Sequence, residues 1–176
     1  INFFISFDDG FIDNYYLVFP YLKNKKIFWT IYITTVFLKT NNKNYINTNH
    51  LIELSKSNYV SIGSHGKSHT SLLNLDIKDI KKELEYSKKL LEDLIGKEVN
   101  SFSYPNGSCD KRVALYVAKA GYDFAVNSYP YFNQGSANPY LLNRQSVISY
   151  DDIKSFNLKI TGKFDWTRIK MHNPHL

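Results

Sequence analysis

The sequence predicts an α/β fold in which parallel strands form the core and helices cover them on the outside. Three observations support this prediction. Segments of strand character alternate with segments of helical character along the chain. The strand-like segments are apolar runs rich in Ile, Val, Phe and Tyr, as expected of buried strands. Parallel neighbours need long crossovers, and helical segments stand where these crossovers are required.

The expected strands are apolar, aromatic and β-branched. Along the chain they are residues 1–7, 27–33, 59–64, 99–104, 122–127 and 139–147. Three of them lead into polar loops that contain glycine, with the sequences DDG, SHGKSH and YPNG. Because the carboxyl ends of parallel strands share one edge of the sheet, we expect these loops to open on the same face.

The clearest expected helix runs from Asp76 to Ile95. Apolar side chains recur on one face of it, and Gly96 is a stop signal. Its acidic residues interleave with lysines and predict a solvated face, which includes Glu83, Glu85, Glu92 and Asp93. The other expected helices are 12–26, interrupted by Pro20; 47–57, with Asn47 or Thr48 near its N-cap; 110–120, ended by Gly121; and 151–160.

The bulk composition indicates one folded domain. A length of 176 residues suits a single core, so residues 1–176 are interpreted as one domain. The hydrophobic share of 43% and the aromatic share of 16% argue against a disordered chain. The first residue is not Met, which suggests a fragment of a longer chain, and residues 161–176 are expected to form an irregular tail.

Charge and cysteine content exclude several classes of partner and site. The net charge is +6, but the lysines are scattered and form no basic stripe with interleaved aromatics, so we expect no nucleic-acid partner. Cys109 is the single cysteine, which excludes an internal disulfide and a cysteine-rich zinc site. No apolar run approaches the length of about 20 residues that spans a bilayer.

The loop SIGSHGKSHT (residues 61–70) is the first candidate for chemistry. His65 and His69 are four residues apart, so over one helical turn they could face a single ion. Two imidazoles and one carboxylate give three ligands and an open position for water, which is the usual arrangement of catalytic zinc. The alternative is a solvated turn that holds two unrelated histidines.

The pair Asp8 and Asp9 is the second candidate. Successive side chains leave a strand in different directions, so one carboxylate could bind a metal while the other takes a proton from water. The alternative is a simple turn, since Asp and Gly are common in turns. The turn SYPNGS (residues 103–108) offers backbone N–H groups for an oxyanion, although a plain β-turn explains it equally well.

In this order the motifs resemble those of the polysaccharide deacetylases of carbohydrate esterase family four, the NodB homology domain. SFDDG (residues 6–10) matches the family's T/S-F-D-D-G strand end. HGKSH (residues 65–69) matches the spacing of H-S/T-x-x-H, with Gly66 in place of Ser or Thr. FSYPNG (residues 102–107) stands where the family has a strand that ends in P-Y-G. The resemblance covers about residues 2–128.

The resemblance implies a fold and an activity. The fold would be an irregular or incomplete (β/α) barrel of about seven parallel strands with outer helices. The activity would be hydrolysis of an N-acetyl group, less often an O-acetyl group, on an amino-sugar glycan with release of acetate. Asp9, His65 and His69 would hold a divalent metal, most often Zn²⁺, with Co²⁺ or Ni²⁺ as alternatives. Asp8 would be the general base on the metal-bound water.

The resemblance also implies roles for residues in the turn after the fourth expected strand. The backbone N–H of Asn106, which stands where the family usually has Tyr, would help to stabilise the oxyanion. Tyr104, Pro105 and Gly107 in the same turn are expected to contact the substrate.

Two departures from the family pattern concern catalytic residues. Ser103 occupies the position of an Arg that orients the base, and Arg144 could take that role from a later strand; the alternative is an ordinary surface Arg. The family's late L-x-H segment supplies the leaving-group acid, and IKMHNPH offers His172 first, with His175 after it. The alternative for His172 is a mobile tail. We interpret His50 as a surface residue.

Three functions follow from these observations. The first is a metal-dependent deacetylase with a glycan substrate. The second is a catalytically impaired carbohydrate-binding relative, in which aromatic residues stack on sugar rings, with Tyr129, Tyr131, Phe132 and Tyr140 as candidates. The third is a deacylase of another amide or ester in surface-polysaccharide biosynthesis. The resemblance points to the cell envelope, the periplasm or secretion, while a cytoplasmic location and the oligomeric state stay open.

Overall fold

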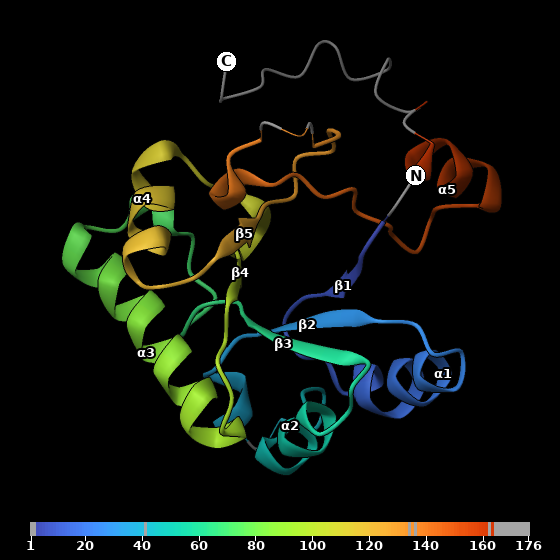
Figure 1. Ribbon diagram of the computed structural model, residues 1–176, viewed down its shortest axis with the longest axis horizontal. Helices are drawn as coiled ribbons and strands as arrows, with labels where there is room; N and C mark the ends of the chain where they lie inside the picture. Colours follow the sequence, from blue (N-terminus) through green and yellow to red (C-terminus); the bar gives the residue numbers. More distant parts are fainter. Residues whose placement is uncertain (1–2, 41, 134, 136, 162, 164–176) are drawn as a thin grey trace.

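Five short parallel strands form one sheet in the order β1-β2-β3-β4-β5 (Figure 1). The computed structural model describes residues 3–40, 42–133, 135, 137–161 and 163. The strands are β1 (Ile5–Phe7), β2 (Trp29–Ile33), β3 (Val60–Ser64), β4 (Ser101–Ser103) and β5 (Phe124–Val126). The α-helices are α1 (Phe19–Asn24), α2 (Thr48–Ser55), α3 (Ile77–Ile95), α4 (Lys111–Lys119) and α5 (Ile153–Ile160).

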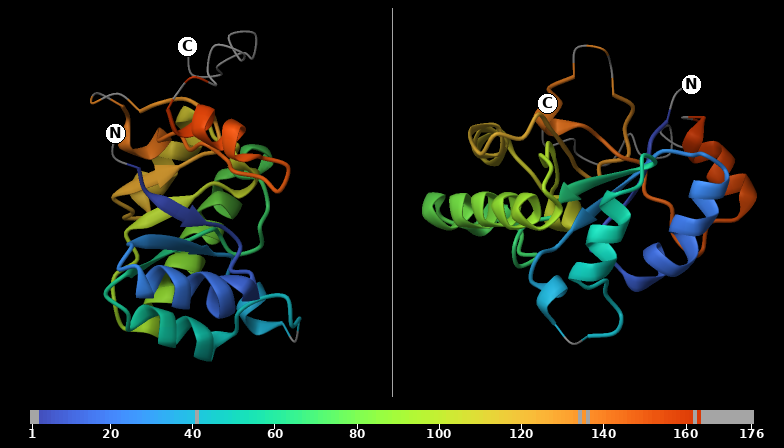
Figure 2. Two further views of the ribbon diagram at one scale, coloured as in Figure 1. Left: turned by 90° about the vertical axis from the view of Figure 1, so that its right-hand side faces the viewer. Right: turned by 60° about the horizontal axis from the view of Figure 1, so that its bottom comes forward.

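The strand order determines the shape of the sheet. When parallel strands follow one another in sequence order, right-handed crossovers place every connecting helix on the same side of the sheet. Helices α1 to α4 accordingly lie around the outside of the curved sheet, and α3 packs between α2 and α4 (Figures 1 and 2). The result is a half-barrel, which confirms the predicted α/β class with outer helices.

The predicted number of strands was too high, because the described residues contain five and not about seven. Residues 139–147 were expected to form a further strand beside β5. Only Leu142 makes a bridge, to Val126, and Pro139–Leu141 form a 3₁₀ turn instead. Pro139 cannot donate to a ladder, and the Asn138 side chain accepts a hydrogen bond from the backbone N–H of Tyr140 and so stabilises the turn.

Helix α3 ends at Ile95 as predicted and begins one residue after the predicted start, because Asp76 is its N-cap. The Asp76 side chain accepts a hydrogen bond from the backbone N–H of Asp79 at 2.8 Å, and Gly96 ends the helix in the left-handed conformation at φ +66°. Ile80, Leu84 and Leu91 are fully buried against the sheet. This helix therefore packs behind β3.

The predicted helix over 12–26 is present as one helical run over residues 12–24, although Pro20 was expected to interrupt it. Asn14–Val18 in this run are π-helical and continue into α1, where Pro20 stands in the first turn. Asn47 caps α2 as predicted, and the His50 imidazole accepts a hydrogen bond from the Asn47 backbone N–H.

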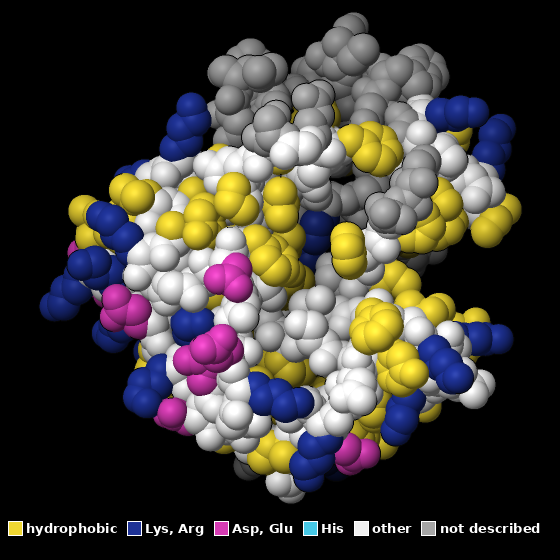
Figure 3. Space-filling model, viewed as in Figure 1, with side chains coloured by type: hydrophobic (Ala, Val, Ile, Leu, Met, Phe, Trp, Pro, Cys, Tyr) yellow, Lys and Arg dark blue, Asp and Glu magenta, His cyan; other side chains and the backbone are white. Residues whose placement is uncertain are grey.

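The surface is mixed in charge over the helices. Figure 3 shows basic and acidic side chains intermingled around α3, and apolar side chains over α1. No helix in the described part of the chain combines the length and the apolar character needed to cross a bilayer.

Candidate metal centre

The carboxyl ends of β1, β3 and β4 converge as expected. Asp8 and Asp9 follow β1, His65 follows β3, and Ser103 is the last residue of β4. Asp9, His65 and His69 each offer one ligand atom, and these atoms lie within 4.8 Å of one another. The His65 Nε2 atom lies 3.6 Å from Asp9 Oδ1, and the His69 Nε2 atom lies 3.1 Å from the same oxygen. The structure therefore brings together the three residues predicted to bind a metal.

The donor set fits a divalent cation. The His65 Nδ1 atom lies 2.8 Å from the carbonyl oxygen of Ser103, which can only accept a hydrogen bond. The proton of the neutral ring is therefore on Nδ1, and the lone pair on Nε2 faces Asp9. Asp9 Oδ1 is buried and accepts no hydrogen bond from any described residue. A bound cation would satisfy this oxygen and both imidazole nitrogens.

Burial keeps His65 in the form that a metal needs. Its side chain is 3% exposed, and desolvation lowers its pKa although Asp8, the Ser103 carbonyl and Asp9 act in the opposite direction. The imidazole is consequently neutral near pH 7. Metal ligation requires this neutral form.

The backbone around the cluster is unusual. Asp9 and His69 have φ values of +71° and +62°, a left-handed conformation that non-glycine residues rarely adopt. The surrounding structure must hold such residues in place, and they occur most often at functional sites. Here the two positive φ values belong to the residue that carries the buried oxygen and to the histidine whose Nε2 atom lies 3.1 Å from it.

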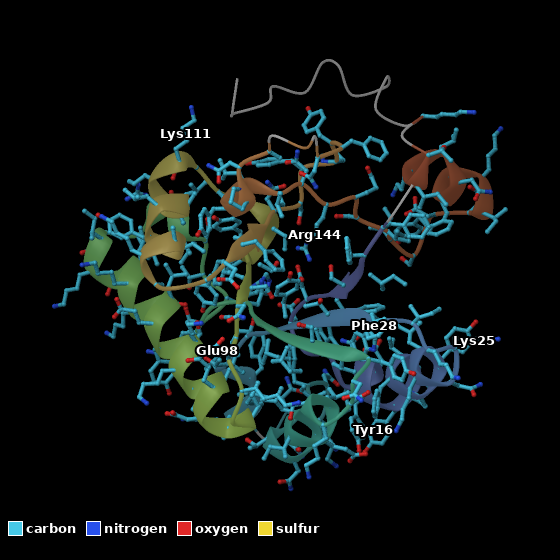
Figure 4. All side chains as sticks on the ribbon, viewed as in Figure 1. Tyr16, Lys25, Phe28, Glu98, Lys111 and Arg144 are labelled. Atoms are coloured by element: carbon cyan, nitrogen blue, oxygen red, sulfur yellow. The ribbon has the colours of Figure 1, made fainter. Side chains whose placement is uncertain are left out.

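Asp8 has different partners from Asp9. Arg144 donates hydrogen bonds to both Asp8 oxygens, at 2.8 Å to Oδ1 and 2.7 Å to Oδ2. Ser103 Oγ donates to Asp8 Oδ2 at 3.1 Å and accepts from Arg144 at 2.9 Å. Figure 4 shows Arg144 in the middle of the molecule, between β1 and the β4–β5 edge. Its side chain is 19% exposed, which is inconsistent with an ordinary surface Arg.

These contacts keep Asp8 ionised. Burial alone would raise the pKa of the carboxyl, but the hydrogen bonds and charge of Arg144, with smaller contributions from His65 and Ser103, outweigh it and hold the pKa below its usual range. The two adjacent aspartates thus differ: Asp8 is bound by a guanidinium, and Asp9 faces the imidazoles.

The turn after β4 is tightly built. Asn106 has φ +59°, and Gly107 has φ +67°. A Cβ atom on Gly107 would lie 2.4 Å from the Cβ of Ser128, so only glycine fits there. Tyr104 is fully buried and donates a hydrogen bond to the carbonyl of Tyr140. The Tyr104 side chain is therefore directed into the core, and the substrate-binding role of Tyr104, Pro105 and Gly107 stays a prediction.

The position of Glu83 corrects one sequence-based interpretation. Glu83 was expected on the solvated face of α3, yet it is only 9% exposed and contacts the loop between His65 and His69. The helical spacing indicated this burial, because Glu83 follows Ile80 by three residues and precedes Leu84 on the buried face.

His172 lies outside the described residues, so its role as the acid stays a prediction. Most of the expected tail over 161–176 also lies outside the described residues.

Comparison with known proteins agrees with the fold and the motifs. The model of the family described as polysaccharide deacetylase matches residues 2–125. The curated Bacillus subtilis protein YxkH, assigned to the polysaccharide deacetylases, is 28% identical over 143 residues, which are 81% of this chain and 50% of that protein. The chain thus spans about half the length of this curated relative.

Two solved structures have the same fold. A Streptococcus pyogenes deacetylase in complex with acetate superposes with a TM-score of 0.81 at 18% identity, covering 89% of this chain and 69% of that one. A polysaccharide deacetylase from Bacillus cereus superposes with a TM-score of 0.79 at 25% identity, covering 89% of this chain and 50% of that one.

Proposed function

This chain belongs to the polysaccharide deacetylase family, and we propose that it is a metal-dependent hydrolase that removes acetyl groups from an amino-sugar glycan. The observation that carries the proposal is that the two adjacent aspartates have different partners. Asp9 Oδ1 faces His65 and His69, whereas Arg144 binds both oxygens of Asp8. The proposed metal-dependent hydrolysis uses both parts, a cation-binding cluster and an ionised base beside it.

Asp9, His65 and His69 would hold the cation, with Zn²⁺ as the first candidate and Co²⁺ or Ni²⁺ as alternatives. When bound, such a cation supplies a Lewis acid that activates water and polarises the carbonyl of the acetyl group. The residues of this chain would supply the remaining functions: a general base, a guanidinium group that orients this base, and a hydrogen-bond donor for the developing oxyanion.

Asp8 would act as the general base. Its pKa is held low, so it is ionised at neutral pH and can accept a proton from the attacking water. Arg144 would orient the Asp8 carboxylate, the role that the family's motif assigns to the position of Ser103. Ser103 Oγ links the two, because it accepts from Arg144 and donates to Asp8.

The backbone N–H of Asn106 would stabilise the oxyanion of the tetrahedral intermediate. Oxygen from water adds to the acetyl carbon, and Asp8 takes the proton. The carbon–nitrogen bond then breaks, the sugar nitrogen leaves as an amine after it gains a proton, and acetate is released. We propose His172 as the acid that protonates the leaving amine.

The test is release of acetate from N-acetylated and O-acetylated glycan oligomers by the purified chain, before and after treatment with a chelator. The proposal expects acetate release that stops with the chelator, returns with Zn²⁺ and is lost in Asp8→Asn. Zinc binding without acetate release from any acetylated glycan would instead support a catalytically impaired carbohydrate-binding relative. Release of a different acyl group would support a deacylase of another amide or ester.

A further inference from the structure

Glu83 is a buried carboxylate on α3 that binds the loop between the two candidate metal ligands. Its Oε2 atom accepts hydrogen bonds from the backbone N–H groups of Lys67 at 2.8 Å and Ser68 at 2.9 Å. Its Oε1 atom accepts from the Ser68 hydroxyl at 2.7 Å. Among the described residues, no Lys or Arg forms an ion pair with Glu83. The loop therefore supplies all three of these hydrogen-bond donors to the Glu83 carboxylate.

The hydrogen bonds to Glu83 favour one conformation of the loop. A buried carboxylate is costly unless donors surround it, so the folded state favours the loop conformation that aims these three donors at Glu83. Lys67 and Ser68 lie between His65 and His69 in sequence. By binding the N–H groups of Lys67 and Ser68, Glu83 therefore restricts the positions of both histidines.

The loop has a conformation that needs external support. Gly66 has φ +78°, and His69 has φ +62°. A Cβ atom on Gly66 would lie 3.4 Å from Glu83 Oε2 and 3.6 Å from the Pro105 ring, which are ordinary contact distances. The left-handed backbone, and not a lack of space, is therefore the physical reason for Gly66 where the family motif has Ser or Thr.

The opposite side of the loop has its own anchors. The backbone N–H groups of Thr35 and Val36 donate to the carbonyls of Gly66 at 3.1 Å and Lys67 at 2.9 Å. The loop is thus held by its carbonyl groups from the β2 side and by its N–H groups from α3. On the β2 side the Thr35 hydroxyl adds one hydrogen bond to the Lys67 carbonyl at 3.5 Å, whereas the contacts from α3 all depend on the Glu83 side chain.

We propose that Glu83 is a positioning residue, which fixes the loop so that the Nε2 atoms of His65 and His69 both face Asp9. This inference rests on the proposed metal site. It predicts that loss of the Glu83 carboxylate weakens metal binding without removing any ligand. Groups that orient metal ligands in this way typically contribute about 10- to 100-fold to metal affinity.

The experiment compares Glu83→Ala and Glu83→Gln with the native chain. Zinc affinity is measured by competition with a chromogenic chelator. Amide hydrogen exchange of Lys67 and Ser68 is measured in the metal-free protein. Glu83→Ala is expected to weaken zinc binding by about 10- to 100-fold and to speed exchange of both amides by about tenfold. Glu83→Gln keeps one acceptor oxygen and is expected to fall between Glu83→Ala and the native chain in both measurements.

Leu91→Val is the matched control, because Leu91 is buried on the same face of α3 but lies two turns beyond Glu83. It is expected to lower the melting temperature and to leave the zinc affinity within about twofold of native, since it does not reach the loop. Native-like zinc affinity in folded Glu83→Ala or Glu83→Gln would overturn the inference alone. Failure of the native chain to bind any of Zn²⁺, Co²⁺ and Ni²⁺ would overturn the metal site and the proposed function with it.

Discussion

Arg144 and Asp8 are 136 residues apart in sequence, yet the guanidinium of one binds both carboxylate oxygens of the other, at 2.8 and 2.7 Å. The same guanidinium donates to Ser6 Oγ, Ser103 Oγ and the carbonyl of Asn127. It therefore connects β1, at one edge of the sheet, with β4 and the chain that follows β5. This contact brings the edges of the half-barrel together at the site.

Replacing Arg144 by Lys should separate charge from geometry. Lysine keeps a positive charge but cannot make two parallel hydrogen bonds to a carboxylate. We expect kcat for acetate release to fall by roughly 10- to 100-fold, because a reacting group shifted by about 1 Å can cost this much. Arg112→Lys is the control, since Arg112 contacts the carbonyls of Leu73 and Leu75 and the Asp110 carboxylate at the surface. Equal rates for native and Arg144→Lys would contradict the orienting role.

Removing both imidazoles should remove the metal. We expect His65→Ala/His69→Ala to lose the zinc that the native chain retains after gel filtration, as measured by elemental analysis, because one carboxylate alone binds zinc weakly. His50→Ala should keep its zinc, since His50 lies on α2 and contacts Asn47 and Tyr15. Native-like zinc content in the double variant would place the metal elsewhere.

The two aspartates should be separable by function. Asp8→Asn is expected to lose roughly 10²- to 10⁴-fold in kcat, the usual contribution of a general base, while retaining zinc. Asp9→Asn is expected to lose zinc, because Asp9 Oδ1 is the oxygen that faces both imidazoles. Rates and zinc content measured on the same preparations decide this, and the reverse result would exchange the two roles.

Gly63 in β3 should not tolerate a side chain. A Cβ atom there would lie 2.4 Å from the Tyr32 ring and 2.7 Å from Ser101 Oγ. We expect Gly63→Ala to lower the free energy of unfolding by ~1–3 kcal/mol, as overpacked cores do. The Tyr32 ring lies under the Arg144 guanidinium, so its displacement should also slow acetate release. Gly135→Ala is the control, with open space around the added atom; chemical denaturation of both variants provides the measurement.

Local patterns predicted much of this structure correctly. The bounds of α3 followed from Asp76, Gly96 and the spacing of Ile80, Leu84 and Leu91, because capping and amphipathicity are properties of neighbouring residues. The convergence of the loops that carry the aspartate pair and the two histidines followed from one topological rule, that parallel strands end at the same edge, and the family resemblance selected Asp9 as the ligand. Neither inference needed contacts that are distant in sequence.

The remainder depended on long-range packing. The contact between Arg144 and Asp8 was one of two interpretations, because sequence does not say how far the sheet curves. Residues 139–147 were predicted to be a strand, but the local turn chemistry of Asn138 and Pro139 outweighed their apolar character. Glu83 was assigned to solvent because charge was given more weight than its position on the buried face of α3.

The 136-residue separation between Arg144 and Asp8 has a consequence for how the protein is made. A nascent chain that has left the ribosome only as far as β5 already carries Asp9, His65 and His69, but the guanidinium that clamps Asp8 is still to come. The Asp8 carboxylate can therefore gain its two hydrogen bonds from Arg144 only after residue 144 has emerged and its segment has packed against β1. Until then, a nascent chain has the proposed metal ligands without the contact that is proposed to orient the base.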